Sequence, residues 1–372
     1  MSPGGPIRRR EKVVGTSDSM QKTENQRKVL KRLRESSFPP AAMIGAFASF
    51  AGAAFGPKSE AANKAPQNVS LVHMDFSEQK RDPMPPRFDL EYGQTLVLGS
   101  ANSEQRFRRS ISAVAVGSAD QISVLGDGEV RTFDSKGMLV RNWKAPEGAL
   151  CMAVGGGGRV YLGRAGQVEI YSAAGIREGG FAAGESGKSA DITAIKIYGP
   201  EILVADASAR CIRRYTETGK LIGEIGTQNK TRGFMLPNRS LDMDVDGKGI
   251  VRATDSGRHR VSSWILDGTP AGYFGKFGLR NPEDFVGCCN PVNIAVAPDG
   301  KIITAEKVIA RVKVFDAAGK LLALIGPEHF DPQCIHLHLA VDSKGRILVA
   351  DPIRLEVKVF SIKTQSGGRA LI

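Results

Sequence analysis

The feature that most constrains the fold of this chain is a short pattern that returns six times. Each copy has an apolar run, a turn that contains glycine or aspartate, and a second apolar run. The copies are VAVGSADQISVLG (114–126), MAVGGGGRVYLGR (152–164), ITAIKIYGPEILVAD (192–206), MDVDGKGIVRATD (243–255), IAVAPDGKIITAE (294–306) and LAVDSKGRILVAD (339–351). Alternation with a period of two, interrupted by turn residues, predicts short β-strands. The chain is therefore expected to repeat one small β unit.

Each unit has room for four strands. In the fifth copy, an alternating segment (311–316), a turn (317–320) and a further apolar run (321–326) follow the pattern. Six units within residues 86–363 average about 46 residues, a length typical of β-propeller blades. A single blade leaves both faces of its sheet uncovered, so the blades must pack against one another. The sequence predicts an all-β, six-bladed propeller of four-stranded blades.

The sixth copy is one strand short. After EVKVF (356–360) the sequence offers no fourth apolar run, whereas GQTLVLGS (93–100) stands alone before the first copy. An outer strand from the N-terminal side would remove the open edge of the last blade. We expect residues 94–99 to pair with residues 356–361 and to close the ring.

The fifth and sixth copies carry a resemblance to a known family. Residues 295–306 with 311–315 and 319–326, and residues 340–351 with 357–360, resemble the NHL repeat. The first two copies depart from it, because Gly126 and Arg164 stand where the repeat has an acid. The resemblance covers about three quarters of the chain and implies a propeller. NHL-type propellers include protein-interaction platforms, RNA-binding modules and metal-dependent lyases, so the fold does not select the function.

Basic residues are concentrated ahead of the propeller. Residues 1–40 hold ten Lys and Arg against four Asp and Glu, a net +6, which is half of the chain's formal +12. The charge is therefore largely a property of the tail and does not by itself predict a nucleic-acid-binding core. The expected parts are a basic disordered tail (1–38), an apolar segment (39–56), a linker (57–85), the propeller (86–363) and a C-terminal tail (364–372).

The apolar segment determines the expected location of the protein. AAMIGAFASFAGAAFG (41–56) is short and weakly apolar for a membrane span. A basic run, a short apolar core and small residues are the components of an export signal. We expect an exported protein, periplasmic or extracellular, or one tethered to the membrane through residues 41–56. The alternative is a disordered basic arm with a small apolar patch.

One cluster of residues has metal-ligand chemistry. Cys334, His336 and His338 occupy alternate positions and would share one face of an extended segment. Thiolate and imidazole bind zinc, iron or copper. Alignment of the copies places His338 at the start of an innermost strand, in register with Asp242 and Asn293, so these side chains would meet at one mouth of the central channel. The alternative is a polar strand start without a metal, in which histidine only makes hydrogen bonds. No other cofactor is predicted.

The five cysteines are too few and too scattered to form a disulfide framework. Cys288 and Cys289 precede the fifth copy, and Cys334 precedes the sixth at a similar offset. The adjacent Cys288 and Cys289 could form a strained disulfide or bind a soft metal. Together with Cys334 they could also form a sulfur cluster or a disulfide between neighbouring blades, which would suit an exported protein. The alternative is that they pack as small apolar residues.

Two sets of charged residues recur. The first comprises the acids that end the second apolar run of copies three to six, Asp206, Asp255, Glu306 and Asp351. We expect these acids to cap turns through backbone N–H groups. The second set is basic and could form a face for a phosphate backbone. It comprises QRFRRS (105–110), Arg258, Arg260, Lys276, Arg280 and Lys307.

The sequence favours an exported, monomeric, non-catalytic platform that holds a protein or a small-molecule ligand on one loop-covered face. One alternative is a metal-dependent, lyase-like enzyme with its site at the central channel. Another is an RNA-binding module, which requires that the protein is not exported. No catalytic residue is predicted, because no triad, phosphate loop or His-Glu-x-x-His motif is present. Whether the protein is an enzyme stays open at this point.

Overall fold

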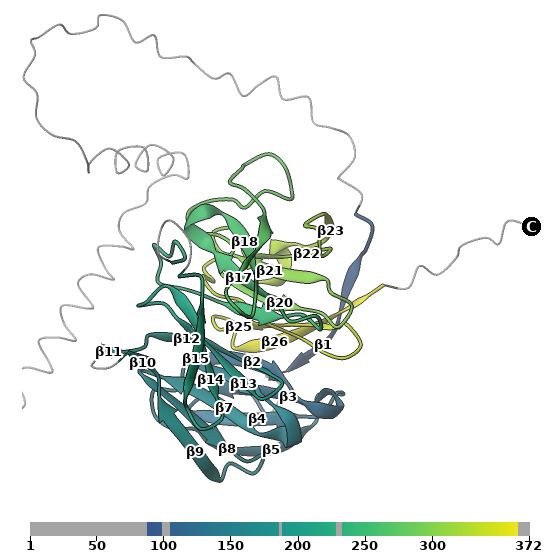
Figure 1. Cartoon of the computed structure of the whole chain (residues 1–372). Coiled ribbons are helices and arrows are strands. Elements are labelled where there is room, and N and C mark those ends of the chain that lie inside the picture. The colour runs from purple at the N-terminus through teal and green to yellow at the C-terminus, as the bar shows by residue number, and fades with distance from the viewer. Residues whose placement is uncertain (1–87, 99–104, 186–187, 228–232, 364–372) are drawn as a thin grey trace, which may run out of the picture. The chain divides into compact units, whose positions relative to one another are not determined.

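The computed structural model describes residues 88–98, 105–185, 188–227 and 233–363. These residues form six antiparallel sheets of four strands and one short hairpin, and the described helical segments are 3-10 turns of three residues. Innermost strands of successive blades contact one another in sequence order, and the last contacts the first. The predicted all-β, six-bladed propeller is therefore confirmed (Figure 1).

The strands of each blade follow one another from the channel outward. Blades 1 and 2 contain β2 (Ile111–Val116), β3 (Ile122–Gly126), β4 (Glu129–Phe133), β5 (Leu139–Lys144), β6 (Cys151–Val154), β7 (Val160–Arg164), β8 (Gln167–Tyr171) and β9 (Arg177–Ala182). Blades 3 and 4 contain β12 (Ile192–Tyr198), β13 (Glu201–Asp206), β14 (Cys211–Thr216), β15 (Leu221–Ile225), β16 (Met243–Val245), β17 (Ile250–Asp255), β18 (Arg260–Ile265) and β19 (Pro270–Phe274). Blade 5 contains β20 (Asn293–Val296), β21 (Ile302–Glu306), β22 (Arg311–Phe315) and β23 (Leu321–Ile325). The hairpin of β10 (Gly184–Glu185) and β11 (Lys188–Ser189) lies between blades 2 and 3.

Blade 6 is assembled from both ends of the propeller. Its strands are β24 (His338–Val341), β25 (Ile347–Asp351), β26 (Glu356–Ile362) and β1 (Tyr92–Leu98). The pairing of β1 with β26 is antiparallel, with Gln94 opposite Phe360 and Leu98 opposite Val357. The predicted closure of the ring by residues 94–99 is confirmed for residues 94–98, and residue 99 lies outside the described part of the chain.

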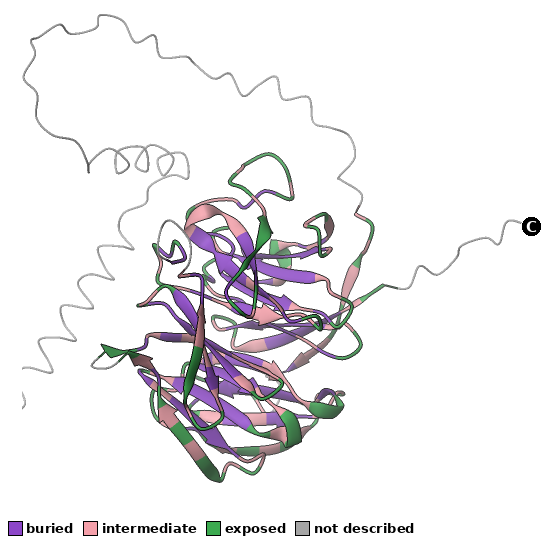
Figure 2. Ribbon diagram, in the orientation of Figure 1, coloured by how far each residue is buried: buried purple, intermediate pink, exposed green. Residues whose placement is uncertain are grey.

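The core lies between the blades. One apolar cluster joins Val124 and Phe133 of blade 1 to Leu348, Val357 and Val359 of blade 6. In Figure 2 the inner strands are largely buried, whereas the outer strands and the loops are more exposed. Each fully buried aliphatic side chain contributes about 1.5–3 kcal/mol relative to an exposed one. Because both faces of a blade are covered by neighbours, blade stacking accounts for most of this burial.

Antiparallel alternation places one set of connections on one side of the ring. The segments that join blades and the loops between second and third strands all meet the side where innermost strands begin. We call this side the loop face. It contains residues 105–110, 127–128, 145–150, 165–166, 183–185, 188–191, 207–210, 226–227, 233–242, 256–259, 275–292, 307–310, 326–337 and 352–355.

The expected segments outside the propeller are not part of the described structure. The basic tail (1–38), the apolar segment (39–56), the linker (57–85) and the C-terminal tail (364–372) all lie outside the described residues. Within the described ranges, no helix has the length and apolar character needed to cross a membrane.

Candidate functional site

Three of the residues expected at the channel lie together. Asp242 precedes β16, while Asn293 and His338 begin β20 and β24, and all three line one small cavity of about 40 Å³. The Asn293 amide donates a hydrogen bond from Nδ2 to Asp242 Oδ2 at 3.1 Å. A cavity of this size holds a water molecule or a small ion. The repeat alignment therefore identified the starts of β20 and β24 and placed Asp242 one residue before the start of β16.

The cavity has charged partners that the sequence did not suggest. Lys196 lies on β12, and its Nζ is 3.4 Å from Asp244 Oδ2 of β16. Burial opposes the charge on Lys196, but the carboxylates of Asp244 and Asp242 raise its pKa. Burial also raises the pKa of Asp242, although Lys196 acts in the opposite direction. The channel mouth therefore holds an ion pair of Lys196 and Asp244, with Asp242 close enough to interact electrostatically with Lys196.

The other titratable groups at this mouth are neutral at neutral pH. Burial lowers the pKa of His338 to about 4, and His336 adds to the effect. Burial raises the pKa of the Cys151 thiol to about 12, with a contribution from Asp242. The Oδ1 atom of Asn293 is buried and has no hydrogen-bond partner within the described residues. A buried acceptor of this kind is usually satisfied by a water molecule or a ligand donor.

Cys334 does not share a strand face with His336 and His338, contrary to expectation. Residues 331–337 form a turn in which the Cys334 N–H donates to Asp331 O at 3.0 Å, and the strand begins only at His338. Cys334 Sγ donates to the backbone oxygen of His336, and the side chain packs in the core between blades 5 and 6. Across the described ranges, no group of three or more His, Cys, Asp or Glu side chains could hold a metal ion. The metal site stays a prediction without a ligand set.

All five cysteines are free thiols. The structure brings Cys288 and Cys289 together, with 2.9 Å between their Sγ atoms. Cys334 belongs to the separate apolar cluster described above, and Cys151 and Cys211 are buried in other blades. The expected three-cysteine cluster is therefore reduced, among the described residues, to the adjacent pair.

The acids at the ends of second strands have a structural role. Each accepts a backbone N–H from the segment that joins its blade to the previous one. The pairs are Asp191 N to Asp206, Met235 N to Asp255, Val286 N to Glu306 and Asp331 N to Asp351, at 3.1, 2.8, 3.0 and 2.8 Å. Asp206 and Asp351 also accept N–H groups of the turns that follow them, as predicted. The acids therefore fix the loop face to the blades.

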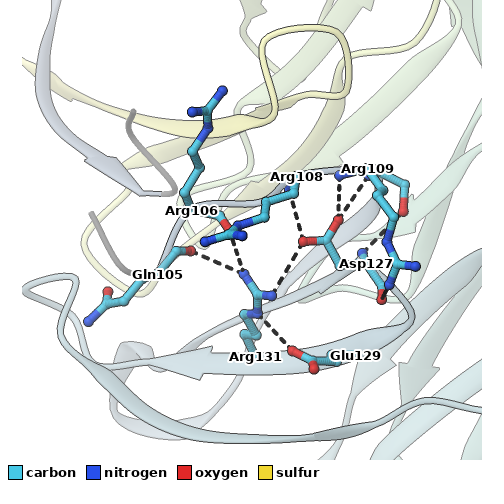
Figure 3. Close-up of polar contacts among 8 residues, drawn as sticks. Gln105, Arg106, Arg108, Arg109, Asp127, Glu129 and Arg131 are labelled. Carbon is cyan, nitrogen blue, oxygen red and sulfur yellow. Dashed lines mark hydrogen bonds and ion pairs between the residues drawn. The ribbon is translucent and has the colours of Figure 1, made fainter. Parts of the chain in front are cut away.

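Blade 1 contains the same device one residue later than the repeat predicts. Asp127, not Gly126, accepts the N–H groups of Arg108 and Arg109 at 2.9 and 2.7 Å (Figure 3). The Arg131 guanidinium pairs with Asp127 at 3.3 Å and with Glu129 at 3.0 Å. Sequence reasoning missed Asp127 because the repeats were aligned on the second strand, which put Gly126 at the position of the acid. Alignment on the following turn would have identified Asp127.

Several residues of the expected basic face make internal ion pairs or hydrogen bonds. Arg258 and Arg260 pair with Asp255 at 2.8 and 3.0 Å, and the Arg109 guanidinium donates to Asp127 O at 2.8 Å. Lys276 lies 3.9 Å from Asp284. These cations balance local carboxylates or carbonyl groups, so the loop face offers fewer of them to phosphates than the sequence suggested.

Seven of the exposed large apolar side chains lie in the loop-face segments of blades 4 to 6, whereas Leu150 is the one described in the loop-face segments of the other blades; sequence reasoning missed this distribution. Leu279 is 72% exposed, Val308 64% and Ile335 62%. We call this set the apolar patch, which comprises Met235, Phe277, Leu279, Val308, Ile309, Ile335 and Ile353. Apolar residues inside turns, such as KVIA (307–310), were the available signal.

Comparisons with known proteins support the fold. No protein-family model matches the chain, and no curated protein matches it. A streptogramin B lyase structure is similar, with 9% identity and a TM-score of 0.51 over 68% of this chain and 93% of that one. A catalytically inactive virginiamycin B lyase from Staphylococcus aureus, solved with quinupristin, has 12% identity and a TM-score of 0.52 over 73% of this chain and 100% of that one. The shared feature is the propeller, and identities this low carry no function.

Proposed function

We propose that this chain is an exported propeller of the NHL type that acts as a non-catalytic platform and binds another protein through the apolar patch. The observation that supports this proposal is the concentration of exposed apolar side chains on one side of the loop face. Exposed apolar residues on one face of a soluble protein are a feature of protein–protein interaction sites. The patch would supply the buried centre of the interface, and cations around it such as Arg280 and Lys307 would form the polar rim.

The strand-end acids fit the same proposal. Hydrogen bonds from Val286 to Glu306 and from Asp331 to Asp351 fix the backbone of the segments that carry Phe277, Leu279 and Ile335. A platform with a fixed backbone loses little conformational entropy on binding, so more of the contact energy appears as affinity.

The two alternatives have weaker support. The lyase-like alternative needs a reactive centre in the channel, but the cavity is small and no metal-ligand group is formed by the described residues. Its remaining support is the likeness in fold to two lyases. The RNA-binding alternative needs free cations, and Arg258 and Arg260 are paired with Asp255.

Photo-crosslinking tests the proposal directly. A photoreactive amino acid at Leu279 is expected to give one discrete crosslinked protein in cells, because this side chain lies in the patch. The matched control carries the same amino acid at Ile222 of β15, which is 40% exposed but lies on an outer strand away from the patch. The Val308→Asp substitution is expected to reduce the Leu279 crosslink about tenfold, since a charge in the centre of an interface costs at least 1–2 kcal/mol.

Other outcomes of this experiment are equally informative. Equal crosslinking at Leu279 and Ile222, or no product at either position, contradicts the platform. A product that disappears after nuclease treatment favours the RNA-binding alternative. Export is tested separately by joining residues 1–60 to a reporter enzyme that is active only after disulfide formation, because disulfides form outside the reducing cytosol.

A further inference from the structure

The loop face also carries a pair of adjacent cysteine thiols. Cys288 and Cys289 lie on the segment that joins blades 4 and 5, and their Sγ atoms are 2.9 Å apart. Both are free thiols, and no group of the platform proposal uses them. Two thiols at this distance need to approach by roughly 0.9 Å to reach the about 2.0 Å of a disulfide bond.

The surrounding backbone fixes the pair. Asn290 is fully buried, and its Nδ2 donates to Val286 O at 2.6 Å and to Lys307 O at 3.0 Å, while its Oδ1 accepts from Lys307 N at 2.9 Å. Val286 N is in turn held by Glu306 at 3.0 Å. The two residues that flank the pair, Gly287 and Asn290, therefore stand in a segment whose ends are attached to blade 5.

The two thiols differ in accessibility. Cys288 is exposed, whereas Cys289 is only 3% exposed. Burial raises the pKa of Cys289 to about 11, and the adjacent Cys288 adds to the shift. An outside reagent therefore meets Cys288 first, and Cys289 reacts only with a sulfur that is already beside it.

We propose that Cys288 and Cys289 form a redox-active dithiol, which a low-molecular-weight disulfide oxidises to an intramolecular disulfide and a low-molecular-weight thiol reduces again. The Cys288 thiolate attacks one sulfur of the small disulfide, and the first small thiolate leaves and takes up a proton. The Cys289 thiol then loses its proton and attacks Cys288 Sγ, and the second small thiolate leaves. Two protein thiols are oxidised, and one small disulfide is reduced to two small thiols.

The adjacency of the two residues makes the oxidised form reversible. Consecutive Cα atoms lie about 3.8 Å apart, whereas the two Cα atoms of an ordinary disulfide lie about 4.4–6.8 Å apart. A bond closed over the shorter separation is strained, and strained disulfides belong to the labile, easily reduced class. The geometry therefore suits a site that cycles between two states. This proposal does not depend on the apolar patch having a partner.

Mass spectrometry of the full chain tests the proposal. The reduced protein is incubated with an excess of glutathione disulfide, and its intact mass and its count of free thiols under denaturing conditions are measured. The expected product has lost two hydrogen atoms and two of its five thiols. Both losses should map to the peptide that contains residues 288 and 289, and dithiothreitol should restore both thiols.

Serine variants separate the steps. Cys289→Ser is expected to stop at the mixed disulfide and to retain one glutathione on Cys288, whereas Cys288→Ser should react at least tenfold more slowly than wild type. Cys334→Ser is the matched control for a buried thiol elsewhere and should behave as wild type. The proposal is overturned if the wild-type protein keeps a stable glutathione adduct, if its thiols stay unchanged, or if either cysteine bonds to a third one.

Discussion

Lys313 illustrates how a single residue couples stability to pH. Its side chain is fully buried, with Nζ 2.6 Å from Glu306 Oε1, and the same carboxylate is 3.0 Å from Arg311 Nε. The Glu306 carboxylate therefore forms ion pairs with both Lys313 and Arg311 in a region that is almost closed to solvent. Burial lowers the pKa of Lys313 to about 8, because it outweighs the attraction of Glu306.

This arrangement predicts a stability gain at alkaline pH. Between the folded pKa of about 8 and the ordinary lysine pKa of 10.5, the unfolded chain binds the proton that the folded chain has released, so the free energy of unfolding rises with pH. The gain is on the order of 3 kcal/mol across this window. Urea unfolding of wild type and Lys313→Met at pH 7 and pH 10 measures it, since the variant lacks the titrating group. Parallel pH profiles of the two proteins would exclude a shifted pKa for this lysine.

The residues of the site show which features a sequence reveals. The equivalent positions of Asp242, Asn293 and His338 were found because the repeat fixes their register, although Asp242 lies one residue before its strand. Lys196 was not predicted, because it lies in the middle of β12. Alternation in a strand separates its two faces, but it does not show which residues border the channel. The turn at Cys334 was missed because alternate spacing has meaning only in a strand.

Among the strands, β1 closes the ring by pairing with β26 of blade 6. Leu98 is 2% exposed and belongs to the cluster that joins blade 1 to blade 6. Leu98→Ala removes apolar contacts at this junction, and it is expected to lower the free energy of unfolding by about 2–5 kcal/mol. The urea midpoint measures the change.

The control for this prediction lies on the same strand. Gln94 pairs with Phe360 through its backbone, but its side chain is exposed. Gln94→Ala should change stability by no more than about 0.5 kcal/mol. If the two substitutions cost the same, burial at the closing strand is not what stabilises the ring.

The regular elements were predictable, and the connections between them were not. Four strands per blade, and even the strand supplied by residues far ahead of the last blade, follow from alternation and from the need to cover an open edge. The long segments 226–242 and 275–292 have no counterpart in the other repeats. The positions of Phe277, Leu279 and the adjacent cysteines could therefore be known only from the structure. The dithiol and three residues of the apolar patch, Met235, Phe277 and Leu279, lie on these connections.

At the scale of the whole molecule, the two tryptophans of the chain report on distant blades. Trp143 lies on β5 of blade 1, and Trp264 lies on β18 in the cluster that joins blades 3 and 4. Trp143→Phe and Trp264→Phe each leave one fluorescent probe. Leu98→Ala, added to each background, weakens only the junction of blades 6 and 1, which Trp264 does not contact.

In a closed ring, this local change should reach both probes equally. No blade can unfold without uncovering an apolar face of each neighbour, so the blades are expected to unfold as one unit. Leu98→Ala should therefore shift the urea midpoints of Trp143 and Trp264 fluorescence by the same amount. Comparison within each background removes the cost of the tryptophan substitution itself. A shift confined to Trp143 would mean that the free energy of unfolding is a sum of terms from neighbouring pairs of blades, as in an open repeat array. Closure by β1 would then cover the open edge of blade 6 without making the blades unfold together.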